Sequence, residues 1–309
     1  MRWGGLCQAR HDHAGVVPLH EAMMGRQLFL HGFVRYWHAM RNLIACSLLC
    51  ALAAAPVAAG ETPWQEVAPG VTMRLVSSGV VKADGTSLIG LELDMPADTK
   101  TYWRVPGDTG IPTELDFTAS TGVSAHQILW PYPIRDETEA YLDYAYFGPT
   151  LLPIQLAVDS DAAQIEVSVV MGVCSDICIP AQAKFSMPIA EGGKDMPNGL
   201  RIKQAVAMAP IPWDGDEAPI GDVEFRPQDN ALAVLINDPS IDPASLIAAM
   251  ADGDRAFGTP QKSPEPNLVL IPLLGKVADG ELDSQPVQLT FITDMGAFEI
   301  TRTLGGAQD

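Results

Sequence analysis

The alternation of apolar and polar side chains in short segments is the feature that most constrains the fold of this chain. Between Gln164 and Met171 the alternation is strict, so that Ile165, Val167 and Val169 would share one face of an extended strand. Similar segments recur along the chain and are separated by Gly, Pro, Asp and Ser. This rhythm is typical of antiparallel β-sandwiches, and we therefore predict an all-β fold.

The predicted strands fall into two blocks. The candidates in the first block are Val71–Val76, Leu88–Met95, Thr101–Val105, Glu114–Thr118, Gln127–Trp130, Leu151–Val158, Gln164–Met171 and Ala183–Ile189. We assign this block to a β-sandwich domain covering residues 60–192. The pair Gly192-Gly193 and the stretch Pro197-Asn-Gly199 are read as breaks after it.

The second block predicts a smaller β-sandwich over residues 193–309. Its candidate strands are Gly221–Phe225, Ala231–Ile236, Leu268–Leu273, Val287–Thr293 and Phe298–Thr303, with a turn at Asp294–Ala297. Asp242 and Pro243 have the character of an N-cap and a first helical residue, so a short helix is expected over Pro243–Met250. This block contains no cysteine and no histidine, which favours a spacer or docking module.

The N-terminal segment has the pattern of an export signal. Met40 is followed by one positive charge, an apolar run from Leu43 to Ala55, and small residues at Val57 and Ala59 that suit signal peptidase. We therefore expect residues 1–59 to comprise an upstream extension and a signal peptide, with translation starting at Met40. The run is too short for a stable membrane-spanning helix, so the mature protein is expected in the periplasm and not across the membrane.

Charge and histidine content argue against two classes of function. The whole chain has a formal charge of −19; without residues 1–59 it keeps 14 basic and 36 acidic side chains, which gives −22. Nucleic acid is therefore not an expected partner. The predicted mature chain has a single histidine, His126, which leaves no Ser-His-Asp set for hydrolysis.

A single close pair of cysteines, Cys174 and Cys178, belongs to the predicted mature chain. A disulfide across so short a loop stabilises a fold by roughly 2 kcal/mol, against roughly 4 for a loop of 50 residues or more. The pair is thus a poor staple for a large domain, whereas adjacent thiols can form and exchange a bond through a mixed disulfide. We predict that it is redox-active and lies at the end of a hairpin, with no cofactor required.

The residues around the pair predict thiols of low reactivity. Asp176 lies inside the loop, and Ile177 and Pro180 add apolar surface, all of which disfavour a thiolate. No Lys or Arg stands within five residues of either sulfur in the sequence. We therefore expect a pair that stays unreactive until a partner docks.

Three stretches resemble the periplasmic N-terminal domain of the transmembrane thiol–disulfide interchange proteins of the DsbD family, in particular the ScsB-like branch linked to suppression of copper sensitivity. They are Lys100-Thr-Tyr-Trp-Arg-Val-Pro-Gly-Asp-Thr-Gly-Ile-Pro112, Leu129-Trp-Pro-Tyr-Pro-Ile-Arg135 with Leu151-Leu-Pro-Ile154, and Val173-Cys-Ser-Asp-Ile-Cys-Ile-Pro-Ala181. The resemblance covers roughly residues 62–190. The three-residue spacer between the cysteines is shorter than in the best-known members.

The resemblance implies an immunoglobulin-like fold and a component of a protein-disulfide reductase system. Such domains pass electrons between a membrane thiol conduit or thioredoxin-like protein and periplasmic substrates, in roles such as cytochrome c maturation. It implies that Cys178 forms the mixed disulfide, that Cys174 resolves it, and that Tyr141 or Tyr144 belongs to an aromatic cap over the pair. The alternative for these two tyrosines is ordinary core packing. Trp103, Arg104 and Asp108 would be structural or rim residues.

Two alternatives stay open at this stage. Two thiolates can bind Cu(I), a soft ion, and Met171 and Met187 are nearby in the sequence, so a copper-tolerance protein is conceivable. The other alternative is a β-sandwich binding module with an inert disulfide, in which replacing both cysteines would leave function intact.

Overall fold

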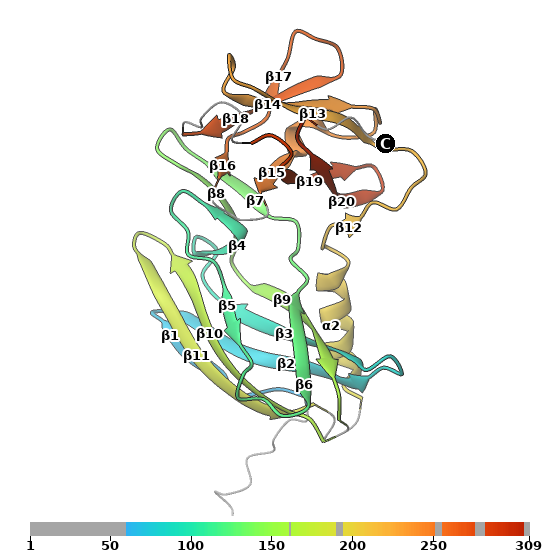
Figure 1. Cartoon of the computed structure of the whole chain (residues 1–309). Helices are drawn as coiled ribbons and strands as arrows, with labels where there is room; N and C mark the ends of the chain where they lie inside the picture. Colours follow the sequence, from blue (N-terminus) through green and yellow to red (C-terminus); the bar gives the residue numbers. More distant parts are fainter. Residues whose placement is uncertain (1–59, 161, 190–193, 251–254, 276–281, 306–309) are drawn as a thin grey trace, which may run out of the picture. The chain divides into compact units, whose positions relative to one another are not determined.

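The structure is a computed structural model, and it describes residues 60–160, 162–189, 194–250, 255–275 and 282–305 (Figure 1). The described residues belong to one compact unit. The predicted start codon and signal peptide in residues 1–59 lie outside them. Among the described residues, the structure contains no helix with the length and apolar character needed to cross a membrane.

The first β-sandwich is built from two antiparallel sheets. One sheet has the strand order β1-β2-β3-β9-β6 and consists of β1 (Gln65–Ala68), β2 (Val71–Val81), β3 (Thr86–Asp94), β9 (Thr150–Val158) and β6 (Val123–Ile128). The other has the order β11-β10-β4-β8-β7, with β5 also paired to β10. Its strands are β11 (Cys178–Pro188), β10 (Gln164–Cys174), β4 (Lys100–Gly107), β8 (Leu142–Phe147), β7 (Ile134–Glu137) and β5 (Glu114–Asp116).

The hydrophobic core of this sandwich lies between the two sheets. Ile165, Val167 and Val169 of β10 are buried as the alternation predicts, and the residues between them are partly exposed. The fully buried Trp103 of β4 contacts the Tyr144 ring of β8 edge-on, with 5.9 Å between centroids. Strands β7 and β8 were not among the predicted strands.

Strands β10 and β11 form a long hairpin without a register shift. The pairing runs from Gln164 opposite Pro188 to Cys174 opposite Cys178. Because facing residues of an antiparallel pair lie close together, this register alone brings the two cysteines side by side at the hairpin end. The prediction that the pair ends a hairpin of the sandwich is confirmed.

An α-helix, α2 (Met196–Val206), replaces the break expected at Pro197-Asn-Gly199. The Asp195 carboxylate caps it by accepting a hydrogen bond from the Asn198 backbone N–H at 3.0 Å. Pro197 lies in the first turn, where the missing N–H is not needed, so this proline is compatible with a helix start. The helix packs against β2, β3 and β9 and buries Ile202. The reading of this stretch as a break was wrong.

The second β-sandwich also consists of two sheets. The strands of the first, in the order β12-β20-β19-β15, are β12 (Ile211–Pro212), β20 (Gly296–Thr303), β19 (Pro286–Thr293) and β15 (Ile247–Met250). The second has the order β13-β14-β18-β16, with β17 also paired to β18; its strands are β13 (Ile220–Arg226), β14 (Ala231–Ile236), β18 (Leu268–Leu274), β16 (Ala256–Phe257) and β17 (Gln261–Lys262). These sheets enclose a second core that includes Leu232, Ile271 and Phe291. The prediction of an all-β chain with a second sandwich is therefore confirmed.

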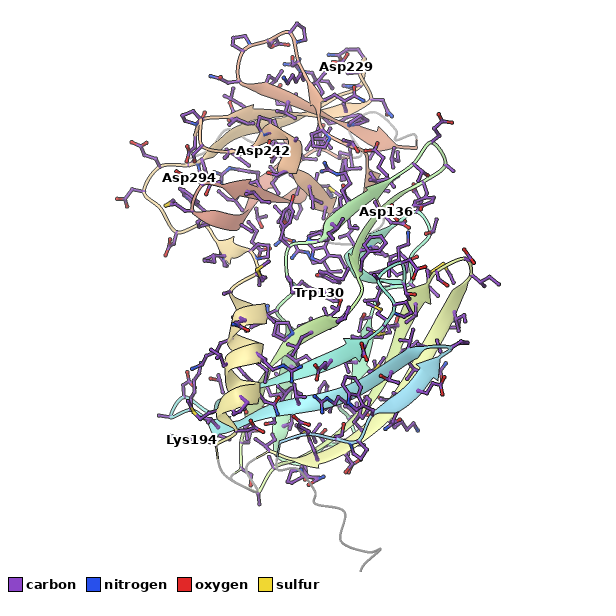
Figure 2. The ribbon with its side chains drawn as sticks, turned by 180° about the vertical axis from the view of Figure 1, so that it is seen from behind. Trp130, Asp136, Lys194, Asp229, Asp242 and Asp294 are labelled. Carbon is purple, nitrogen blue, oxygen red and sulfur yellow. A yellow bond between two sulfur atoms is a disulfide. The ribbon has the colours of Figure 1, made fainter. Side chains whose placement is uncertain are left out.

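Two local predictions in the second block have different outcomes. Asp242 does act as a cap, because its carboxylate accepts a hydrogen bond from the Ala244 N–H at 3.0 Å. The expected helix, however, is only a 3-10 turn at Pro243–Ser245, and Ile247–Met250 forms strand β15 along β19. All four residues of β15 are buried, so pairing and burial outweigh local helix signals there. The turn between β19 and β20 contains Asp294, as predicted (Figure 2).

Candidate functional site

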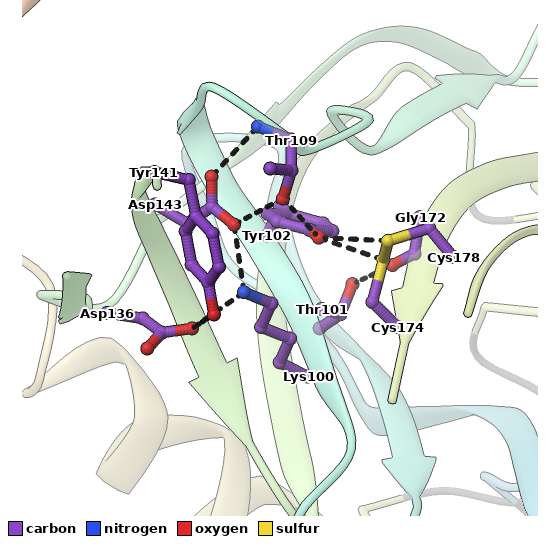
Figure 3. Close-up of a disulfide and its surroundings, with 10 residues drawn as sticks. All are labelled: Lys100, Thr101, Tyr102, Thr109, Asp136, Tyr141, Asp143, Gly172, Cys174 and Cys178. Atoms are coloured by element: carbon purple, nitrogen blue, oxygen red, sulfur yellow. Dashed lines mark hydrogen bonds and ion pairs between the residues drawn. A yellow bond between two sulfur atoms is a disulfide. The ribbon is translucent and has the colours of Figure 1, made fainter. Parts of the chain in front are cut away.

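The site is organised around a disulfide between Cys174 and Cys178, whose sulfurs are 2.01 Å apart (Figure 3). Cys174 is the last residue of β10 and Cys178 is the first residue of β11. The loop between them is closed by a backbone hydrogen bond from Ser175 N–H to the Ile177 carbonyl at 3.3 Å. A rigid hairpin thus presents the disulfide at its tip.

The two cysteines differ in access to solvent. Cys174 is only 2% exposed and packs with Tyr102 and Ala145. Cys178 is exposed, and the neighbouring Ile177 is 73% exposed. An incoming thiolate from another protein can therefore approach the sulfur of Cys178, whereas the sulfur of Cys174 is covered by the sheet.

The side chain that contacts both sulfurs is Tyr102 of β4. Its hydroxyl donates a hydrogen bond to Cys174 Sγ at 2.8 Å and lies 3.5 Å from Cys178 Sγ (Figure 3). The residue is fully buried. A Cβ atom added at Gly110 would lie 2.4 Å from one edge of its ring, and one added at Gly172 would lie 3.0 Å from the other. The two glycines thus leave just enough room for the ring beside the disulfide.

A chain of hydrogen bonds connects Tyr102 to a buried carboxylate. The Tyr102 and Thr109 hydroxyl oxygens are 3.3 Å apart, and the Thr109 hydroxyl donates to Asp143 Oδ2. The Thr109 N–H donates to Asp143 Oδ1 at 3.0 Å. Asp143 belongs to β8 and has no exposed surface. The chain runs from the disulfide through Tyr102 and Thr109 to Asp143 (Figure 3).

Lys100 provides the positive charge beside this carboxylate. Its Nζ lies 2.8 Å from Asp143 Oδ2 and 2.6 Å from Asp136 Oδ2 of β7. The ammonium also lies over the Tyr141 ring at 4.5 Å and over the Tyr102 ring at 5.6 Å. One buried cation therefore links β4 to two carboxylates of the neighbouring hairpin.

Burial and charge change the ionisation of two groups in this network. Burial raises the pKa of Tyr102 above its usual value, so its hydroxyl keeps its proton over the physiological range. For Lys100, burial alone would lower the pKa, but the hydrogen bonds to Asp136 and Asp143 outweigh it and the pKa is raised. The site therefore holds a neutral phenol and a charged ammonium.

The two tyrosines expected in the cap have different positions. Tyr144 is buried in the core against Trp103. Tyr141 is half-buried on the hairpin of β7 and β8, where its hydroxyl donates to Asp136 Oδ2 at 3.3 Å (Figure 3). The aromatic ring that contacts the sulfurs in this structure is that of Tyr102. Shielding of the pair by Tyr141 or Tyr144 stays a prediction.

Some of the other predicted residues lie at the hairpin tip, and the rest lie away from it. Asp176, Ile177 and Pro180 are exposed beside Cys178. Trp103 is fully buried in the core, and the Arg104 guanidinium lies over its ring and donates to Glu299 at 3.1 Å.

Asp108 lies beside the network without joining it. Its carboxylate accepts a hydrogen bond from the Leu142 N–H at 2.9 Å. Its role is therefore to hold the segment after β4 against the start of β8.

The residues considered for copper are in other environments. Met171 and Met187 are buried in the first core, and the His126 ring lies 4.6 Å from the Phe117 ring. Among the residues that the structure describes, no group of three or more His, Cys, Asp or Glu could hold a metal ion.

The sequence analysis missed Lys100, Tyr102, Thr109 and Asp143 as parts of one network. Lys100 faces Cys174 directly in the pairing of β4 with β10, although 74 positions separate them in the sequence. A usable signal was present, because Lys100, Tyr102 and Thr109 all lie in the first stretch that carries the family resemblance.

The first sandwich, which carries the disulfide, is similar to a known protein family. Residues 73–189 match the family model described as the N-terminal part of the thiol:disulfide interchange protein DsbD. This part of the chain is an immunoglobulin-like β-sandwich that is similar to the DsbD N-terminal domain, in agreement with the resemblance seen in the sequence.

One solved structure extends the likeness beyond that region. The chain is similar to the crystal structure of the N-terminal periplasmic domain of ScsB from Proteus mirabilis, with a TM-score of 0.65 and 20% sequence identity. The match covers 81% of this chain and 100% of the other, so the shared fold includes more than residues 73–189. No curated protein matched the chain.

Proposed function

We propose that this protein is a periplasmic thiol–disulfide interchange protein. Its Cys174–Cys178 pair would relay two electrons between a membrane or thioredoxin-like donor and periplasmic substrate proteins. The observation that carries this proposal is the unequal exposure of the two sulfurs, with Cys178 accessible and Cys174 buried against Tyr102. An inert disulfide has no need of such an arrangement.

The first step of the proposed reaction uses this difference. A thiolate of a donor dithiol attacks Cys178 Sγ, a donor–Cys178 disulfide forms, and the Cys174–Cys178 bond breaks. Cys174 leaves as a thiolate, and Tyr102 donates its hydrogen bond to that developing charge at the position where it already contacts the sulfur. Charge-assisted hydrogen bonds of this kind are stronger than neutral ones, so the bond favours release of Cys174.

The second step completes the transfer. The second thiol of the donor loses its proton to solvent and attacks its own partner sulfur in the mixed disulfide, which releases Cys178 as a thiolate. The donor leaves as a disulfide, and both cysteines take up protons. Two electrons have then passed from donor to pair, and the same steps in reverse reduce a substrate disulfide.

The hairpin tip supports docking of a thioredoxin-like partner. Ile177 and Ile179 are 73% and 36% exposed on either side of Cys178, which is unusual for isoleucine and offers an apolar rim. The family likeness and the periplasmic source of the ScsB domain support the same class of partner and the same location. The export signal expected in residues 40–59 would deliver the chain there.

The division of the chain is part of the proposal. Residues 60–192 would form the redox domain, and residues 193–309 a second domain that serves as a spacer or docking module. The exposed sulfur belongs to the first sandwich, and the second contributes no side chain within hydrogen-bonding distance of it among the described residues.

Peptide-resolved alkylation of the full chain across a series of glutathione ratios tests the proposal. We expect a reversible two-electron transition of the pair. In single variants, Cys178 in Cys174→Ser should form a mixed disulfide with glutathione much faster than Cys174 in Cys178→Ser, because only the former sulfur is exposed. A pair that resists reduction until the protein unfolds would support the inert binding module, and faster reaction at Cys174 would contradict the assigned order of attack.

A further inference from the structure

The direction of the hydrogen bonds around Tyr102 has a consequence for the reduced protein. A carboxylate has no proton to donate, so the Thr109 hydroxyl must give its proton to Asp143. The Thr109 oxygen can then only accept a hydrogen bond from the Tyr102 hydroxyl. A disulfide sulfur also only accepts. The single Tyr102 proton is therefore shared between two competing acceptors, the Thr109 oxygen and Cys174 Sγ.

The fold surrounds Asp143 with hydrogen-bond donors. Its oxygens accept hydrogen bonds from the Thr109 N–H, the Thr109 hydroxyl and the Lys100 ammonium. All three contacts present a donor to Asp143, so the Thr109 hydroxyl is oriented as a donor toward it. The direction of the chain is fixed at this end as long as the pair with Lys100 persists.

We propose that the Asp143 carboxylate, acting through the Thr109 hydroxyl, draws the Tyr102 proton away from the sulfurs and so holds reduced Cys174 as a thiol until exchange begins. In that state every donor points toward Asp143: Cys174 S–H to Tyr102, Tyr102 O–H to Thr109, and Thr109 O–H to Asp143. A thiolate at Cys174 requires the Tyr102 proton to turn to the sulfur, and Thr109 then loses its donor. Asp143 and Thr109 are thus positioning residues, whereas Tyr102 contacts the reacting sulfur.

The charged groups around Cys174 also affect how readily it forms a thiolate. Lys100 faces it from β4 and favours a thiolate, whereas Asp143 of β8, Asp136 of β7 and Asp176 of the tip loop disfavour one. Tyr141 contacts Lys100 and Asp136. Replacing Thr109 leaves these charged residues in place, but Thr109→Val also removes a donor from Asp143, so the variant has to be compared with and without the Tyr102 hydroxyl.

The test follows alkylation of Cys174 against pH in the full chain carrying Cys178→Ser, read on the Cys174 peptide by mass spectrometry. Thr109→Val removes the competing acceptor, so we expect the pKa of the Cys174 thiol to fall. Alkylation at neutral pH should then be about fivefold faster, which corresponds to the net free energy of one hydrogen bond. Thr109→Ser keeps the hydroxyl and should behave as the parent. Thr109 is exposed, so neither change opens the core.

A second background separates this effect from a merely structural one. In Tyr102→Phe no proton can be redirected, so Thr109→Val should cause no further change in the pH profile. An unchanged Cys174 pKa in Thr109→Val, or an equal shift with and without the Tyr102 hydroxyl, would overturn the inference. The inference rests on the proposed function, but the two fail separately. If the pair exchanges normally and the Cys174 pKa is unchanged in Thr109→Val, only the inference is contradicted. If the pair cannot be reduced, the proposed function is contradicted.

Discussion

The hydroxyl of Tyr102 and the sulfur of Cys174 are 2.8 Å apart in a small buried cluster separate from the main core of the first sandwich, and the phenol is the donor. Their strands are neighbours, since β4 pairs with the last residues of β10. The same hydroxyl lies 3.5 Å from the sulfur of Cys178, a residue that is exposed to solvent. A buried donor therefore stands where negative charge appears when the exposed sulfur is attacked.

Replacing Tyr102 with Phe removes this donor and keeps most of the ring. We expect reduction of the disulfide by glutathione to slow by about fivefold, because the leaving thiolate loses a hydrogen bond worth about 1 kcal/mol. Tyr146→Phe is the matched control, since Tyr146 is also buried but its hydroxyl donates to the Pro131 carbonyl. Equal reduction rates in the two variants would show that the Tyr102 hydroxyl takes no part in release.

Gly110 tests how tightly the Tyr102 ring is held. A Cβ atom there would lie 2.4 Å from the ring and 2.5 Å from Pro106 Cβ, so Gly110→Ala should destabilise the fold by about 1–3 kcal/mol and slow disulfide reduction. Gly199→Ala in α2 serves as control: its nearest neighbour would be Ser78 Cβ at 3.6 Å, and the helix should gain up to about 1 kcal/mol. Denaturant unfolding measures both, and equal stability of the two variants would contradict the crowding at Gly110.

The sequence predicts the parts of this fold that depend on local pattern. The alternation in β10 identifies its buried face, and the close spacing of Cys174 and Cys178 identifies the hairpin end. Strands with less regular patterns were missed or displaced. The edge strand β6, for example, covers Val123–Ile128 instead of Gln127–Trp130, because its exposed middle residues give no alternation.

The network around the disulfide could not be predicted in the same way, because strand pairing assembles it. The sequence correctly shows no basic residue within five positions of either sulfur, yet Lys100 faces Cys174 across the sheet. Asp143 reaches the same place from β8, a strand that the pattern did not reveal. Register between distant strands is set by the whole core, so such contacts are not encoded in any short window.

Asp195 should matter for the helix that the sequence reading missed. Asp195→Ala removes the acceptor for the Asn198 N–H and side chain, and we expect a loss of about 1 kcal/mol in the free energy of unfolding. Asp195→Asn is the control, because asparagine caps helices about as well. If alanine and asparagine give the same stability by chemical denaturation, the cap at α2 contributes nothing.

Stability should fall at alkaline pH because buried phenols resist ionisation. Burial raises the pKa of Tyr132 to about 12. An unfolded tyrosine ionises near pH 10, so between about pH 10 and 12 the unfolded state loses protons that the folded state keeps. The contribution is complete below pH 10 and is lost as pH rises through that window. The raised pKa values of Tyr144 and Lys100 act in the same direction.

Urea unfolding measured between pH 7 and 12, with tyrosinate absorbance in the near ultraviolet as a second probe, checks this expectation. The free energy of unfolding should change little up to about pH 9 and then decline, with tyrosinate appearing as the protein unfolds. In Tyr132→Phe the decline should be shallower, because one phenol no longer ionises in the unfolded state. Stability that holds through pH 12, or tyrosinate formed fully in the folded protein, would contradict the burial of these hydroxyls.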